Sequence, residues 1–149
     1  MKKLYFMLIA LLCSSGLKAQ VVSALALTVQ KQTNCTQYYQ MFGDEPCKCG
    51  SKYMSKVIAI NPGATHTYPN SISLGGSYPA MPKGIVGARI PDGPASCITS
   101  GGTVGHQPCN LPPTYSYTSI AATCAPCSFT RATWIPGQNC EQMARLIFQ

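Results

Sequence analysis

Alternating apolar and polar positions recur along the chain and predict short β-strands. Residues 53–68 show this pattern best: an aliphatic, β-branched run over 55–60 precedes a Pro62-Gly63 pair, and alternation resumes over 64–68. Alternation on both sides of a Pro-Gly pair is typical of two strands joined by a turn. Because both faces of the first strand are apolar, we expect it to lie at the centre of a sheet.

The remaining elements predicted from the pattern are also strands, with at most one helical turn at 141–144. They are expected over residues 21–32, 35–43, 84–90, 115–123, 128–135 and 145–148. Gly87 interrupts one of them and indicates a bulge or a close backbone approach. We therefore predict an all-β fold, a disulfide-stapled antiparallel β-sandwich of about eight strands, with Trp134 in its core.

The first nineteen residues follow a different pattern, that of a signal peptide. A lysine pair precedes a short apolar run over residues 4–12, and Ala19 offers a cleavage site. The run is too short for a membrane-spanning helix, which needs about 20 apolar residues, and it resembles signal peptides of Gram-negative bacteria. We expect residues 1–19 to be removed near Ala19. Residues 20–149 would then form a single secreted or periplasmic domain without a transmembrane segment.

Cysteine content agrees with export. Eight cysteines follow the predicted cleavage site, and an even number in an exported chain indicates a disulfide framework. Their spacing does not fix the pairing, so we predict that all eight are bonded in unknown pairs. They are Cys35, Cys47, Cys49, Cys97, Cys109, Cys124, Cys127 and Cys140.

The charge of the chain indicates no particular partner. The formal net charge is +7, and it falls to +4 once the three lysines of residues 1–19 are removed. The basic residues stand singly, without the Lys/Arg clusters that bind phosphate backbones or anionic membranes. We therefore attribute the charge to solubility and predict no nucleic-acid partner.

The sharpest motif is Cys124-Ala125-Pro126-Cys127. It resembles the CxPC redox centre of thioredoxin-like oxidoreductases, which implies a small exported thiol-disulfide oxidoreductase as one alternative. That chemistry needs the first cysteine at a helix N-terminus, whereas residues 128–135 alternate as a strand. We therefore predict a structural role for both cysteines.

Metal and hydrolytic chemistry find less support. Cys47 and Cys49 could be combined with the CAPC pair into a four-thiolate zinc site, but exported thiols normally pair with each other first. His66 and His106 are the only two histidines, and they lack ligand spacing. We predict no catalytic residue, no metal and no cofactor.

Tyrosines and long loops are the remaining candidates for ligand contact. Exposed tyrosines could form a platform for a protein or glycan, although cross-strand packing explains their abundance more simply. The candidate contacts are Tyr38, Tyr53, Tyr78, Tyr115 and Tyr117. The proline-rich loops 69–83 and 91–113 are further candidates, and the cysteines in the second predict that it is braced, as in a protease inhibitor or toxin. The layout resembles small secreted bacterial β proteins, and we predict a non-catalytic binding or surface-associated module for an extracellular protein or glycan.

Overall fold

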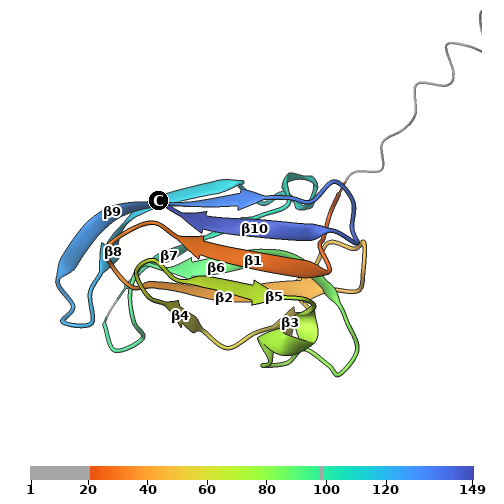
Figure 1. Cartoon of the computed structure of the whole chain (residues 1–149), viewed down its shortest axis with the longest axis horizontal. Coiled ribbons are helices and arrows are strands. Elements are labelled where there is room, and N and C mark those ends of the chain that lie inside the picture. The colour runs from red at the N-terminus through yellow and green to blue at the C-terminus, as the bar shows by residue number, and fades with distance from the viewer. Residues whose placement is uncertain (1–20, 98) are drawn as a thin grey trace, which may run out of the picture.

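The computed structural model describes residues 21–97 and 99–149, and within them the chain forms ten strands (Figure 1). The strands are β1 (Ala26–Lys31), β2 (Gln37–Asp44), β3 (Tyr53–Met54), β4 (Ile58–Ile60), β5 (Thr65–Tyr68), β6 (Gly84–Pro91), β7 (Gly101–Gly105), β8 (Thr114–Ile120), β9 (Pro126–Ile135) and β10 (Met143–Phe148). The predicted all-β fold is confirmed. The predicted signal peptide and its cleavage site near Ala19 lie outside the described residues.

The strands of this described part form two five-stranded sheets. The order in the first sheet is β5-β1-β10-β9-β8, and in the second it is β3-β2-β6-β7, with β4 paired to β2. Alternate side chains from both sheets meet in one core, in which Leu27, Met41, Ile90 and Leu146 are fully buried. The alternation seen in the sequence therefore corresponds to one core-facing side of each sheet.

The pairing of β1 with β10 is parallel, whereas the other strand pairs are antiparallel. Ala26 lies opposite Met143 and Lys31 opposite Phe148. The first and last strands of the described chain thus run side by side in one direction. The predicted antiparallel pairing is therefore observed for every strand pair except β1–β10.

The prediction that residues 55–60 form a central strand is wrong. Only Ile58–Ile60 is a strand, and it pairs with β2 beside the main path of its sheet. Val57 is 50% exposed and Ala59 is exposed. The central position belongs to β6, which is flanked by β2 and β7 and buried over most of its length. An apolar run indicates a strand, but it does not say which neighbours will cover that strand.

Glycines explain why β7 was missed in the predicted loop 91–113. Residues 101–105 read Gly-Gly-Thr-Val-Gly and carry almost no apolar signal, yet they pair with β6. A Cβ at Gly102 would lie 2.4 Å from the Tyr115 ring, so only glycine lets that ring cover the strand. Gly87 behaves as predicted: a Cβ there would lie 2.5 Å from the Val104 carbonyl oxygen, and the β2–β6 register shifts beside it.

Two smaller expectations also differ from the structure. Ser71–Leu74, inside the predicted loop 69–83, is a short 3-10 helix capped by the Asn70 side chain. Residues 139–142 form a turn, in which the Asn139 carbonyl accepts from the Gln142 amide, and no helical turn follows.

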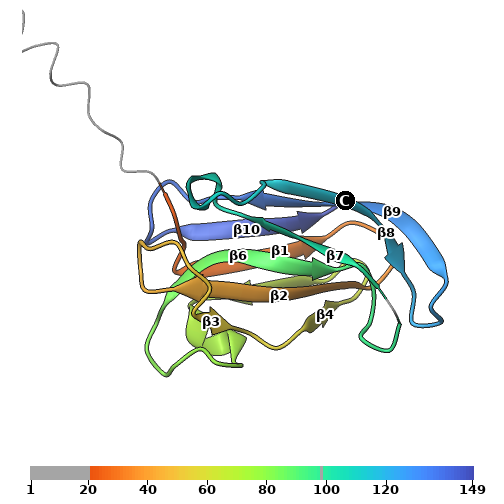
Figure 2. The same ribbon diagram turned by 180° about the vertical axis from the view of Figure 1, so that it is seen from behind.

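The cysteines gather at the two opposite ends of the sandwich. Cys35–Cys127 and Cys97–Cys124 lie where β8 turns into β9, which we call the hairpin end. Cys49–Cys109 lies where the chain enters β1, the N-terminal end (Figure 2). Cys47 and Cys140, also at the N-terminal end, are not joined. The described residues thus contain three of the four bridges that the cysteine count predicts.

Candidate functional site

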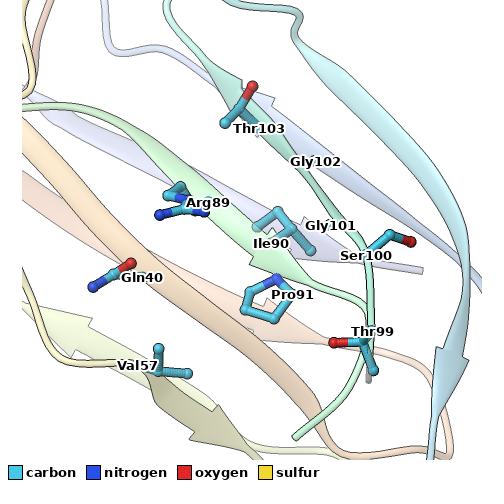
Figure 3. A pocket seen from close by; sticks show the side chains of 10 residues that line it. All are labelled: Gln40, Val57, Arg89, Ile90, Pro91, Thr99, Ser100, Gly101, Gly102 and Thr103. Atoms are coloured by element: carbon cyan, nitrogen blue, oxygen red, sulfur yellow. The ribbon is translucent and has the colours of Figure 1, made fainter. Parts of the chain in front are cut away.

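A groove lies on the outer face of the second sheet. It has a volume of about 610 Å³ and is lined by Gln40, Val57, Arg89, Ile90, Pro91, Thr99, Ser100, Gly101, Gly102 and Thr103 (Figure 3). Its lining thus comes from β2, β6, β7 and two loops. This volume is in the range of small-ligand sites.

Three polar side chains form a row across the groove. Gln40 lies opposite Arg89 in the β2–β6 pair, and Arg89 lies opposite Thr103 in the β6–β7 pair. Because neighbours across a sheet project to the same face, all three point away from the core. Figure 3 shows Arg89 between the other two. β-Sheet register therefore fixes the spacing of the three groups.

Arg89 is exposed and forms no ion pair with any described residue. The nearest acid in sequence, Asp92, is 9% exposed and already accepts hydrogen bonds from Ser100 Oγ and, at 2.9 Å, from Tyr115 Oη. Asp92 therefore holds the wall of the groove and does not neutralise Arg89. A guanidinium in this setting offers several donors to a planar anion such as a carboxylate.

Gln40 is held in place from the opposite wall. Its Nε2 donates to the Ser55 carbonyl oxygen at 2.8 Å, which leaves the amide oxygen free to face the groove as an acceptor. The hydroxyls of Thr99 and Thr103 add groups that can donate or accept. The residues that line the groove include no His, Cys, Asp or Glu.

The two histidines of the chain, His66 and His106, occupy different environments. His66 Nδ1 lies 2.7 Å from Tyr39 Oη, which also contacts Tyr68 Oη at 2.8 Å. His106 is 1% exposed, and its Nδ1 lies 3.0 Å from the Val86 carbonyl oxygen. Neither histidine lines the groove.

A second hollow, of about 240 Å³, lies at the N-terminal end and is lined by His106 and Trp134 among others. The two rings meet edge to face with centroids 5.3 Å apart. Burial lowers the pKa of His106, so the imidazole is held neutral. The Nδ1–H then donates to Val86, and the ring serves as a packing partner of the tryptophan.

The five candidate tyrosines do not come together on one surface. Tyr53 and Tyr78 contact each other at 5.9 Å between ring centroids, and Tyr115 and Tyr117 stack at 5.1 Å. Tyr78 and Tyr117 are buried, and Tyr38, Tyr53 and Tyr115 are half-buried. Only Tyr115 touches the groove wall, through its bond to Asp92. Direct ligand contact by the half-buried tyrosines stays a prediction.

The CAPC cysteines are bonded to different partners. Cys124 pairs with Cys97, and Cys127 pairs with Cys35. A CxxC redox centre requires the two cysteines to bond to each other in the oxidised state. Of the four cysteines of the zinc arrangement considered above, Cys49, Cys124 and Cys127 belong to three separate bridges, and Cys47 is unbonded. No cluster of three metal-ligating side chains occurs in residues 21–97 and 99–149.

One position in the sequence does indicate the outer face on which the groove lies. Arg89 is the only polar side chain in the run Gly-Ile-Val-Gly-Ala-Arg-Ile. A single charge on an otherwise apolar strand marks a position that faces solvent. Gln40 and Thr103 could not be joined to it without the register, because they lie far away in the sequence.

Comparisons with protein families, with curated proteins and with solved structures find no match to the chain. Among the described residues, no helix is long and apolar enough to cross a membrane. The bonded cysteines indicate an oxidising compartment. The function must therefore be argued from the groove itself.

Proposed function

We propose that the protein is an exported, non-catalytic binding module, and that its groove receives a negatively charged group of an extracellular glycan or protein. The observation that carries this proposal is the unpaired Arg89 guanidinium, flanked by Gln40 and Thr103 on a rigid sheet. A carboxylate seated on Arg89 would accept two parallel hydrogen bonds. The Gln40 amide oxygen would accept from a neighbouring hydroxyl or amide.

The size of the groove and the nature of its walls support the same ligand. Val57 and Pro91 provide apolar surface beside the polar row, as in Figure 3. Ligand sites commonly combine such apolar contact with a few well-placed polar groups. Glycan rings and short peptides both present this mixture. The absence of an acid or base from the lining favours binding over turnover.

Replacement of Arg89 tests the proposal. A hydrogen bond to a charged group contributes about 1.5–3 kcal/mol, so Arg89→Gln should weaken binding of an acidic ligand by about tenfold to hundredfold. The matched control is Arg145→Gln, which removes an exposed arginine from β10 in the other sheet and changes net charge equally.

The measurement is calorimetric titration with acidic oligosaccharides, with acidic peptides and with their neutral counterparts. Selective binding of one acidic set, lost in Arg89→Gln and kept in Arg145→Gln, supports the groove as the site and identifies the ligand class. Equal losses in both variants would instead indicate non-specific attraction to the basic surface. Binding unaffected by either variant would place the site elsewhere.

A further inference from the structure

The two unbonded cysteines lie on either side of Ser23. Cys140 lies in the turn just before β10, whose first residue Met143 pairs with Ala26, and its thiol interacts with the Val22–Ser23 segment. From the other side, the Cys47 amide donates to Ser23 Oγ at 3.0 Å. Residues 93 positions apart in the sequence are thus brought together by one buried serine.

The two thiols are close enough to influence each other's ionisation. The hydrogen bond with Cys140 is the main cause that raises the pKa of Cys47, to about 11. Burial on its own would raise the pKa of Cys140, but hydrogen bonds from Cys47 and from the Val22–Ser23 segment outweigh it and lower the pKa. The two thiols therefore titrate as an interacting pair.

The surroundings favour oxidation of this pair. The other six cysteines of the described domain are bonded, and the Cys49–Cys109 bridge lies beside the same segment, since Cys109 Sγ is 3.2 Å from the Val22 carbonyl oxygen. Cys47 is exposed and Cys140 is partly exposed, so a soluble oxidant can reach them. An oxidising compartment that closes three bridges acts on this pair as well.

We propose that Cys47 and Cys140 are an oxidation site that closes into a fourth disulfide, which fastens the 44–50 loop and the 136–142 loop to each other across Ser23. One thiolate attacks the disulfide of an exported thiol oxidant, forms a mixed disulfide and releases one oxidant thiolate. The second cysteine then attacks the mixed disulfide. A Cys47–Cys140 bond forms, two electrons pass to the oxidant, and it leaves as a dithiol.

Tryptic digestion of the exported protein without reduction, after alkylation of free thiols, tests the bond directly. Cleavage after Lys31, Lys48 and Arg131 places Cys35 and Cys47 in peptide 32–48, and Cys140 alone in peptide 132–145. Cys97, Cys109, Cys124 and Cys127 all fall in peptide 90–131. The observed bridges therefore hold peptides 32–48 and 49–52 to peptide 90–131, and none of the three bridges involves 132–145.

With the fourth bond present, peptide 132–145 is recovered only in the linked species, joined to 32–48 and free of alkyl label. Recovery of 132–145 as a separate alkylated peptide would overturn the proposal, as would its linkage to peptide 49–52. In the matched variant Cys47→Ser, peptide 132–145 should be released while 32–48 stays linked through Cys35. The readout does not depend on any ligand, so it can fail while the groove proposal stands.

A second measurement, the thermal midpoint of unfolding, tests whether the bond stabilises the domain. The bond would close a loop of 93 residues, and such a constraint raises the thermal midpoint of a domain this size by roughly 10 °C. Cys47→Ser and Cys140→Ser should each lower the midpoint by this amount, and the double variant by no more than either one. Additive losses would mean that the two residues act separately and would contradict the bond.

Discussion

The two ends of the sandwich each hold four cysteines but are stabilised differently. At the hairpin end, residues 122–127 are all exposed, and two bridges tie this turn to Cys35 and Cys97. At the N-terminal end, Trp134 and His106 are buried against each other, and one bridge is present with two thiols. Covalent bonds thus hold the end that has little core. Apolar packing holds the other.

The difference also concerns the groove. Its wall around residues 99–101 lies at the hairpin end, where Cys97 and Asp92 fasten the loop to β8 and the β8–β9 turn. A binding surface built on loops needs such restraint, because an unrestrained loop loses entropy when it binds. In the proposed binding function, the bridges of this end would therefore support the groove as well as the fold.

Removal of the Cys35–Cys127 bridge should produce the largest change. It closes a separation of 92 residues, whereas Cys97–Cys124 closes 27. Chain-entropy arguments give about 4.6 kcal/mol for the first and about 3.5 kcal/mol for the second. Urea unfolding of the two double-alanine variants measures both free energies. A greater loss from the shorter loop would show that local restraint of the hairpin, and not chain entropy, dominates there.

Replacement of Trp134 by alanine tests the packing of the N-terminal end. Trp134 is 2% exposed, so its removal should cost about 3–5 kcal/mol, as for other buried large aromatics. Phe129→Ala is the control, because Phe129 lies on the same strand but is 72% exposed. We expect that control to change the free energy of unfolding by less than about 0.5 kcal/mol. Similar losses of unfolding free energy in both variants would mean that apolar packing does not distinguish the N-terminal end from the hairpin end.

The smallest expected effect is a pH dependence confined to the N-terminal end. Burial lowers the pKa of His106 in the folded state, so below about pH 6.5 the unfolded chain binds more protons than the folded one. Stability should therefore fall as the pH drops through this value, and the loss should stop once the folded pKa is passed. Thermal midpoints between pH 8 and 5 measure it. In His106→Gln this part of the profile should be flat, and an unchanged slope would assign the dependence to other groups.

Alternation predicted the fold class because successive side chains of a strand point to opposite faces of its sheet. A sheet with one face in the core therefore has an apolar residue at every second position. β6 and β9 were located almost to their ends by this means. The glycines of β7 carry no such signal, since their role is to leave room for Tyr115. The groove was beyond prediction for a related reason: Gln40, Arg89 and Thr103 become neighbours only through the register of three strands.

The parallel pairing of β1 and β10 has a mechanical consequence. The chain enters β1 at one end of the sandwich and leaves β10 at the other, as Figure 1 shows. A pulling force applied at Val21 and Gln149 would therefore act along these two strands in opposite directions. Their hydrogen bonds, which span six residue pairs, would be loaded together in shear and would not open one after another. Stretching the domain along its length would thus require these hydrogen bonds to break together.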